Sequence, residues 1–229
     1  MTGAVVLTGG AGGLGTAIAA DLTAAGRSVV VLDRVAAAGA IESHVVDASD
    51  EAAMNATIGT IAERHGGIAA LVCAAGSVRE HPVACMSLAD WCAVIDASLT
   101  STFLAARAVL PAMIAARCGA IVAFSSGYAT SGYRNGANYA AAKAGVEALI
   151  KSIALENAEY GIRANCIAPG PIETPMLTRE RAAIVTPLIP MRRTGVPADV
   201  VGVVRFLVGE DSAYVTGQTI HVNGGLLMR

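Results

Sequence analysis

The stretch TGGAGGLG at residues 8–15 decides the fold, because it directly follows an apolar run and opens a helical pattern. Gly9, Gly13 and Gly15 permit a tight turn and let the backbone approach a pyrophosphate at the N-terminus of the helix. A glycine-rich turn alone is weak evidence for such a site. Asp33 strengthens it by ending the second apolar run, where a carboxylate can accept hydrogen bonds from the ribose hydroxyls of a dinucleotide.

The choice between the two nicotinamide dinucleotides depends on the same carboxylate. Asp33 repels the 2′-phosphate of NADP(H), so NAD(H) is favoured over NADP(H). In the alternative, Asp33 only ends the strand, and the neighbouring Arg34 holds the phosphate. Asp47 ends the third apolar run, where it either accepts a hydrogen bond from the adenine amino group or forms an Asx turn.

Short apolar runs alternate with helical patterns along the whole chain, and the runs are apolar on both faces, as in the buried strands of a parallel sheet. The predicted strands are 4–8, 28–33, 44–47, 70–75, 120–126, 163–169 and 219–223. The predicted helices are 13–25, 50–65, 87–117, 137–160 and 197–208. This order predicts an α/β fold: a single-domain, Rossmann-type, doubly wound, seven-stranded parallel sheet flanked by helices, over residues 1–229.

The composition excludes several classes of protein. Of the 229 residues, 54% are hydrophobic and 15% are charged, which is enough apolar surface for a sizeable core. The formal net charge is −2 and basic residues form no run, so we expect small molecules as partners, with no nucleic acid and no membrane. The N-terminal stretch has no basic leader with a cleavage pattern, and no apolar run reaches the roughly 18 residues of a membrane span. We therefore expect a cytoplasmic protein.

The five cysteines are odd in number, widely spaced and set among apolar residues. This pattern favours reduced thiols in the core over a disulfide framework, and we expect no metal site. The residues are Cys73, Cys85, Cys92, Cys118 and Cys166.

Both lysines of the chain, Lys143 and Lys151, lie in one predicted helix, and Lys143 follows Tyr139 by one helical turn. A tyrosine pKa of about 10 makes the phenol a poor base at neutral pH, but a nearby cation and an oxidised nicotinamide favour the phenolate. Ser126 ends the fifth predicted strand and can donate a hydrogen bond to a carbonyl or alkoxide oxygen. A Tyr–Lys pair alone is usually part of a helix surface, but together with the glycine-rich turn and the serine it predicts hydride transfer.

These motifs resemble the classical short-chain dehydrogenase/reductase family over essentially the whole chain. T-G-x-x-x-G-x-G is present at 8–15, Y-x-x-x-K at 139–143, and a strand-end serine pair at Ser125 and Ser126. The resemblance implies that Tyr139 is the acid/base, that Lys143 binds the ribose and modulates the tyrosine pKa, and that Ser126 orients the substrate. IAPGPIETPM (167–176) resembles the family's P-G segment, which lines the nicotinamide. The implied cofactor-binding residues are Thr8, Gly9, Gly13, Leu14, Gly15, Asp33, Arg34, Asp47, Ala75, Gly76, Tyr139, Lys143, Pro169, Gly170, Ile172 and Thr174.

The sequence departs from the family pattern at two places. CAAG (73–76) stands where the family usually has N-N-A-G, so that only Ala75 and Gly76 match, although backbone contacts to the cofactor can survive this change. Ser98 stands at the family's fourth catalytic position, an Asn thought to hold a helix kink whose carbonyl binds a water in a proton relay to the lysine. A serine can bond to nearby backbone, so we expect Ser98 to preserve the relay; the alternative is a modified relay with reduced activity.

The substrate is the least determined feature. A short lid is expected at about 173–196, and Tyr128, Tyr133, Arg134 and the loop 77–82 are either pocket walls or solvent-facing loop residues. The leading function is NAD(H)-dependent interconversion of a secondary alcohol (a sugar, polyol, cyclic diol or hydroxy acid) and its ketone.

The rival function is that of an NADPH-dependent 3-oxoacyl-[acyl-carrier-protein] reductase. The segments ANYAAAKAGV and TGQTIHVNGGLLM resemble that subfamily, and Arg117 matches one of its two carrier-docking arginines. The second docking position aligns with Thr178, which precedes Arg179. A non-catalytic dinucleotide-binding sensor or scaffold is the third alternative. The resemblance also implies a homotetramer that pairs the long helices after the fourth and fifth strands.

Overall fold

A central parallel sheet organises the computed structural model, which describes residues 3–38 and 41–228. Its seven strands have the order β3-β2-β1-β4-β5-β6-β7. They are β1 (Ala4–Thr8), β2 (Val29–Asp33), β3 (Glu42–Val45), β4 (Ile68–Cys73), β5 (Gly119–Phe124), β6 (Ile162–Pro169) and β7 (Thr219–Val222). The predicted fold class and strand number are confirmed.

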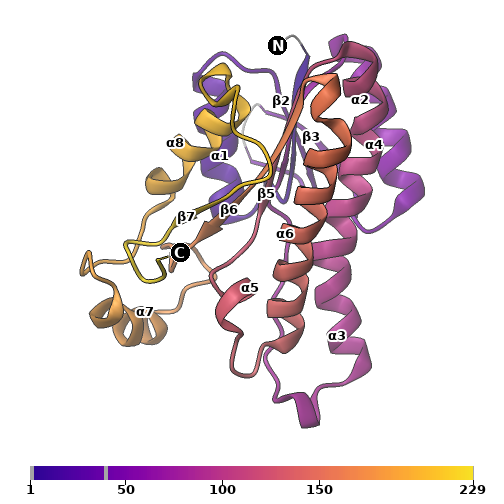
Figure 1. Ribbon diagram of the computed structural model, residues 1–229. Helices are drawn as coiled ribbons and strands as arrows, with labels where there is room; N and C mark the ends of the chain where they lie inside the picture. The colour runs from indigo at the N-terminus through magenta and orange to yellow at the C-terminus, as the bar shows by residue number, and fades with distance from the viewer. Residues whose placement is uncertain (1–2, 39–40, 229) are drawn as a thin grey trace.

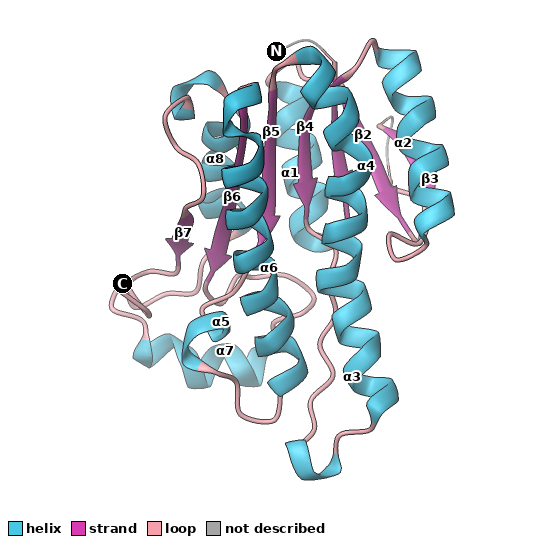
Figure 2. Cartoon of the chain, turned by 45° about the vertical axis from the view of Figure 1, so that its right-hand side comes forward, coloured by secondary structure: helices cyan, strands magenta, loops and turns pink. Residues whose placement is uncertain are grey.

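Helices cover both faces of the sheet, as Figures 1 and 2 show. They are α1 (Gly13–Ala24), α2 (Glu51–His65), α3 (Leu88–Ile95), α4 (Ser101–Ala116), α5 (Tyr128–Ser131), α6 (Ala137–Asn157), α7 (Arg179–Val185) and α8 (Pro197–Val208). One core packs α2, α4 and α6 against the sheet, and the other packs α1 and α8 against its opposite face. The middle strands β1, β4 and β5 are buried along their whole length, which explains why their sequences are apolar on both faces.

The helix predicted at 87–117 runs through Leu88–Ala116 and is confirmed, but it is not α-helical throughout. A π-helical turn, Asp96–Thr100, separates α3 from α4 and contains the buried Ser98. By length and composition alone, the helical stretch Leu88–Ala116 passes the test for a membrane span, so the expectation that no stretch would do so is wrong. Because the buried side of α4 packs into the core, this stretch is equally well described as a core helix.

The topology places a binding site at the carboxyl ends of the strands. The chain reverses its direction of strand addition between β1 and β4, and open α/β sheets bind ligands in the crevice at such a point. In Figure 2 the strands point downward, and α5 and α7 lie beyond their tips. The third strand ends at Val45, so Asp47 lies just beyond it rather than at its last position.

Candidate active site

A cavity of about 1380 Å³ opens at the carboxyl edge of the sheet. It is lined by the glycine-rich turn, the ends of β2 and β5, the start of α6 and the segment after β6. Every predicted cofactor-binding residue lines it except Thr8, and so do Ser126, Tyr139 and Lys143. Sequence positions more than one hundred residues apart are therefore gathered into one site.

The glycine-rich turn has a geometry that only glycine permits at its first position. Gly9 has a φ of +73°, and a Cβ there would lie 2.5 Å from the backbone nitrogen of Ala75. The turn thus packs directly on the loop after β4. Thr8 is buried beneath it and does not reach the cavity, and its carbonyl accepts a hydrogen bond from Ala74 N at 3.0 Å. Thr8 therefore supports the turn from beneath, and a direct contact of Thr8 with the cofactor stays a prediction.

Asp33 lines the cavity next to this turn. Its Oδ2 accepts a hydrogen bond from Ala11 N at 3.0 Å, and its Oδ1 accepts one from Val35 N at 3.3 Å. Each carboxylate oxygen can accept more than one hydrogen bond, so Asp33 can hold the turn and still accept ribose hydroxyls.

Asp47 forms the Asx turn that the sequence left as one of two alternatives. Its Oδ1 accepts hydrogen bonds from Ser49 N at 2.9 Å and Ser49 Oγ at 2.6 Å. The hydrogen bonds from Ser49 hold the pKa of the Asp47 carboxyl below its usual value. A contact of Asp47 with adenine stays a prediction.

Tyr139 and Ser126 form the centre of the site. Ser126 follows β5, and its hydroxyl lies beside the phenol of Tyr139, which is in the first turn of α6. Burial raises the pKa of Tyr139 above its usual value, and the neighbouring Ser126 hydroxyl offsets this only in part. Without the cofactor, desolvation therefore keeps Tyr139 in its phenol form. That a nearby cation and an oxidised nicotinamide together favour the phenolate stays a prediction for the protein with its cofactor bound.

Lys143 lies beneath Tyr139 and is almost fully buried. Its Nζ is 5.7 Å from the centroid of the Tyr139 ring and donates a hydrogen bond to the carbonyl of Phe124 at 2.6 Å. Burial lowers the pKa of Lys143 to about 8. A lysine with such a pKa can exchange a proton near neutral pH.

Only two cysteines lie in the core, contrary to the expectation for all five. Cys73 and Cys166 are buried near Lys143, and burial raises the pKa of each thiol to about 12, so both stay neutral. Cys85 and Cys92 are exposed, and Cys118 is half-buried. Residues 3–38 and 41–228 contain no group of three or more His, Cys, Asp and Glu side chains that could hold a metal ion.

Ser98 departs from its expected role in one respect. Its hydroxyl is buried and has no hydrogen-bond partner in the described part of the chain, so the expected bond to local backbone is not made. Its carbonyl accepts a hydrogen bond from Thr102 Oγ1 at 2.7 Å. A Cβ placed on Gly76 would lie 3.4 Å from Ser98 Oγ and 3.5 Å from Lys143 Nζ, so both groups border the same point. A relay through Ser98 stays a prediction.

The substrate end of the cavity contains residues that sequence reasoning missed. Tyr128 and Tyr133 line the cavity, as the pocket-wall alternative predicted, whereas Arg134 does not. Glu80, from the loop 77–82, and Arg181, from α7 within the predicted lid range, also line it and form an ion pair at 2.6 Å. The C-terminal Leu226 and Leu227 complete the apolar side of the cavity. Apart from the predicted lid range, no sequence signal pointed to Arg181.

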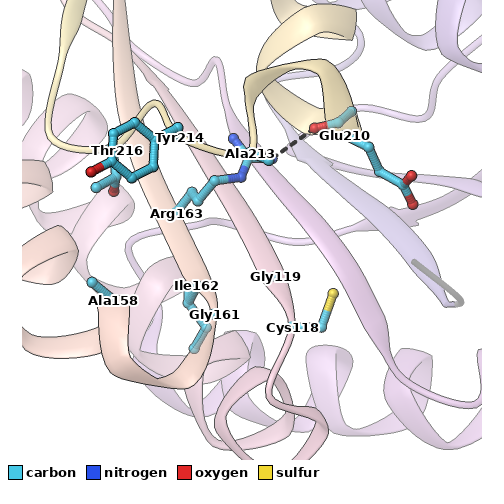
Figure 3. A pocket seen from close by; sticks show the side chains of 11 residues that line it. Cys118, Gly119, Ala158, Gly161, Ile162, Arg163, Glu210, Ala213, Tyr214 and Thr216 are labelled. Atoms are coloured by element: carbon cyan, nitrogen blue, oxygen red, sulfur yellow. Dashed lines mark hydrogen bonds between the residues drawn. The ribbon is translucent and has the colours of Figure 1, made fainter.

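A second hollow of about 600 Å³ lies at the opposite edge, where β5 and β6 begin (Figure 3). Its most polar group, Arg163, donates hydrogen bonds to the carbonyls of Leu207 and Gly209 and to Ser212 Oγ, and so holds the loop after α8. Tyr214 at its rim is fully exposed. This hollow contains no paired proton-transfer groups, so the active-site candidate is the cavity at the carboxyl edge.

The fold and the cavity at its carboxyl edge together define an oxidoreductase that binds a nicotinamide dinucleotide and acts on alcohol or keto groups. A family model described as enoyl-(acyl carrier protein) reductase matches residues 9–227. The chain belongs to the short-chain dehydrogenase/reductase family, as its motifs indicated.

The relatives include 3-oxoacyl-[acyl-carrier-protein] reductases. That of Salmonella typhimurium is 35% identical, with 97% of this chain and 96% of the relative covered. That of Synechocystis is 37% identical at the same coverage.

Similar solved structures carry other activities in their names. The aldohexose dehydrogenase of Thermoplasma acidophilum has a TM-score of 0.94 and 30% identity, with 100% of this chain and 95% of that chain covered. Levodione reductase has a TM-score of 0.92 and 31% identity, with 97% and 96% covered. ElxO with NADP bound has a TM-score of 0.93 and 27% identity, with both chains fully covered.

Proposed function

We propose that this protein transfers a hydride reversibly between a nicotinamide dinucleotide and a ketone or its secondary alcohol. The observation that carries the proposal is that Ser126, Tyr139 and Lys143 converge in the same cavity as the glycine-rich turn. No single one of these features is specific. Their combination provides a proton donor, an oxygen-orienting hydroxyl and a cofactor cradle within one cavity.

The three side chains have distinct tasks in the reduction direction. Ser126 donates a hydrogen bond to the substrate carbonyl oxygen and orients it towards Tyr139. Tyr139 gives its phenolic proton to that oxygen as the alcohol forms, and the raised pKa of its phenol keeps this proton in place beforehand. Lys143 has a pKa of about 8, so its ammonium form is present at neutral pH and stabilises the resulting phenolate. The same ammonium group supports reprotonation of the phenolate.

The cavity fits a dinucleotide on the evidence of its own residues. Gly9 adopts a positive φ that leaves the backbone of the turn uncovered by a side chain, and Asp33 stands at the end of β2 with accepting capacity left. When bound, the nicotinamide supplies or accepts the hydride. The residues that would hold the cofactor are those predicted from the sequence, with Thr8 acting from beneath.

We further propose that NAD(H) is preferred over NADP(H). The Asp33 carboxylate supports this preference, because it lies where a 2′-phosphate would be repelled. Arg34 also lines the cavity and is the residue that would favour NADP(H) instead. The bound NADP in the similar ElxO structure makes this alternative worth a direct test.

A 3-oxoacyl thioester is the first substrate to test. The relatives named above are 3-oxoacyl-[acyl-carrier-protein] reductases. This favours 3-oxoacyl thioesters, the rival substrate class, over the sugars, polyols, cyclic diols and hydroxy acids of the leading hypothesis. In this reaction the 3-oxo group would accept the hydride at carbon and the Tyr139 proton at oxygen. The product would be the 3-hydroxyacyl thioester.

Docking of a carrier protein has less support than reduction of the thioester. Arg117 ends α4 directly before β5 begins, whereas Thr178 and Arg179 begin α7 beyond the carboxyl edge. Arg117 Nη2 donates to the carbonyl of Glu159, and the guanidinium lies over the Tyr160 ring. These arginines therefore do not form one basic patch on a single chain.

A small alcohol or ketone is the second candidate substrate. The structural similarity to an aldohexose dehydrogenase and to levodione reductase favours it. The ion pair of Glu80 and Arg181 also places two hydrogen-bonding groups at the substrate end, where hydroxyl groups could bind.

The test combines cofactor titration with a substrate panel. Binding of NADH and NADPH would be followed by fluorescence. Oxidation of each would be assayed with acetoacetyl-CoA and with butane-2,3-dione, and reduction of NAD⁺ and NADP⁺ would be assayed with glucose. We expect tighter binding of NADH and turnover of acetoacetyl-CoA. Turnover of glucose alone would move the function to sugar oxidation, and binding without any turnover would support a non-catalytic sensor.

The assembly and location of the protein are also proposals. We propose a cytoplasmic homotetramer that acts on small molecules without nucleic acid or membrane partners, supported by the net charge of −2. Phe103 on α4 and Leu155 on α6 are exposed, as expected for helices that pair between copies. Light scattering that shows a concentration-independent monomer would refute the tetramer.

A further inference from the structure

Three side chains from separate segments meet at the substrate end of the cavity. Glu80 comes from the loop after β4, Tyr133 from the loop before α6, and Arg181 from the lid helix α7. Arg181 Nη2 donates hydrogen bonds to Glu80 Oε1, at 2.6 Å, and to the Tyr133 hydroxyl. The Tyr133 hydroxyl in turn donates to Glu80. Both partners of the ion pair thus form hydrogen bonds with the Tyr133 hydroxyl.

The ring of Tyr133 is fixed on two further sides. It stacks on Tyr128 with centroids 4.0 Å apart and planes 11° from parallel. A Cβ on Gly136 would lie 2.1 Å from Tyr133 Cδ1, so the ring rests directly on that backbone. A ring held by stacking, by backbone and by two hydrogen-bonding partners has little freedom to move aside.

This fixed ring stands beside the acid/base residue. The centroids of Tyr133 and Tyr139 are 6.2 Å apart, with the rings at 71° to each other. A carbonyl that accepts the Tyr139 proton must bind next to the Tyr139 hydroxyl, so one of its two substituents is directed past or against Tyr133. A long or branched group on that side would need the space that the ring occupies.

The lid links this end of the cavity with the cofactor end. A Cβ on Gly13 would lie 2.8 Å from Pro175 Cδ, so the beginning of the lid rests on the glycine-rich turn. The helix that follows is tied to the loop after β4 by Arg181 and Glu80, whose side chains are 41% and 38% exposed. An ion pair this exposed contributes little to the stability of the fold. Its effect is to fix the positions of the lid and of the Tyr133 ring.

We propose that Tyr133 determines how large a substituent the reacting carbonyl can carry, with Glu80 and Arg181 as the positioning residues that hold it there. The inference rests on the proposed function, because it requires a carbonyl that reacts at Tyr139. It adds a substrate class: ketones with one compact substituent, such as short-chain 3-oxoacyl thioesters, are preferred over long-chain ones.

The first test compares a short and a long probe. The kcat/KM for acetoacetyl-CoA and for 3-oxodecanoyl-CoA would be measured in the wild type, Tyr133→Ala and Tyr133→Phe. We expect Tyr133→Ala to shift the ratio towards the long probe by about tenfold or more, and Tyr133→Phe to change it less than about threefold. Tyr214→Ala, at a fully exposed tyrosine outside the cavity, is the matched control and leaves the ratio unchanged. An unchanged ratio in a folded Tyr133→Ala overturns the proposal.

The second test separates positioning from direct binding of the substrate. Glu80→Arg and Arg181→Glu each break the ion pair, and each should shift the same ratio towards the long probe by about fivefold. The double variant restores an ion pair of opposite polarity and should restore the ratio. A double variant that behaves like the sum of the single ones would show that these residues contact the substrate directly, which contradicts the positioning role.

Failure of the proposed function would look different. If the wild type reduces neither thioester, the ratio is measured with butane-2,3-dione and benzil as the compact and bulky probes. If none of the four compounds is reduced with NADH or NADPH, and glucose is not oxidised with NAD⁺ or NADP⁺, the proposed function is overturned and this inference with it. An unchanged ratio alongside normal turnover overturns the inference alone.

Discussion

The cofactor end and the substrate end of the cavity are built in different ways. The cofactor end is formed by backbone: a turn at Gly9 with a positive φ, a close approach to Ala75 and a carboxylate fixed by two backbone hydrogen bonds. The substrate end is formed by long side chains from three loops, which meet at Glu80, Tyr133 and Arg181. Backbone geometry demands particular residues at fixed spacing, whereas side-chain clusters can be assembled from many sequences. The first end therefore shows as a motif in the sequence, and the second does not.

The largest expected effect comes from the residue between the two ends. Tyr139→Phe removes the proton donor but keeps the ring, so NADH binding should stay within about twofold while turnover falls by about a thousandfold or more. Fluorescence titration and steady-state kinetics measure the two quantities separately. Turnover within tenfold of the wild type would show that another group supplies the proton.

A single added methyl group at Gly9 should abolish cofactor binding. Gly9→Ala places a Cβ 2.5 Å from Ala75 N at a φ of +73°, so we expect loss of detectable NADH binding and destabilisation by more than about 2 kcal/mol. Gly26→Ala is the matched control, since Gly26 has a φ of +76° but no heavy atom within 4 Å of the added Cβ. It should cost about 1 kcal/mol and leave NADH binding intact. Equal effects of the two variants in thermal melts and titrations would contradict the close approach.

A smaller change sharpens the cofactor preference. Asp33→Asn removes the charge that repels a 2′-phosphate and weakens the bond to Ala11 N, so NADH affinity should fall about tenfold while NADPH affinity rises. The ratio of the two dissociation constants is the readout. A ratio that Asp33→Asn leaves unchanged would mean that Arg34 or another group sets the preference.

The smallest effect is a dependence of stability on pH. The pKa of Lys143 is lowered from 10.5 to about 8 by burial, so the unfolded chain binds the proton more tightly between these values. The penalty for burying the charged lysine is complete below pH 8 and is lost as the pH rises towards 10.5. Lys143→Met should therefore be more stable than the wild type at pH 7, and this advantage should shrink by about 1 kcal/mol between pH 8 and pH 9. Urea unfolding at each pH gives the difference, and an advantage that grows with pH would contradict the assigned shift.

The contrast between the two ends also explains what the sequence could reveal. Buried strands require apolar residues on both faces, and the turn requires glycine, so the sheet, the glycine-rich turn and the Tyr139–Lys143 pair were all predictable. The helix through Ser98 was predicted, but its π-helical turn was not, because no residue in that stretch marks the change of hydrogen-bond pattern. The exposed Cys85 and Cys92 were read as core residues from their apolar neighbours, although some of these, such as Val83 and Leu88, are exposed in the structure.

The segments of the substrate end were named from the sequence as possible pocket walls, but their contacts were beyond prediction for a physical reason. Glu80 and Arg181 are 101 positions apart, and their contact depends on where the lid lies over the cavity. The pKa of Tyr139 depends on how completely its phenol is buried, which the spacing to Lys143 does not give. Properties set by burial and by loop placement require coordinates.

The most direct test of the central claim follows the hydride itself. The protein would be incubated with NADH carrying deuterium at C4 of the nicotinamide, in each of its two stereoisomers, together with acetoacetyl-CoA and butane-2,3-dione. Mass spectrometry of the products would then show which acquires deuterium. We predict one deuterium on the new carbinol carbon, from one stereoisomer only, with the wild type but not with Tyr139→Phe. Tight binding of NADH without deuterium in either product would contradict catalysis at this site and would indicate a dinucleotide-binding protein.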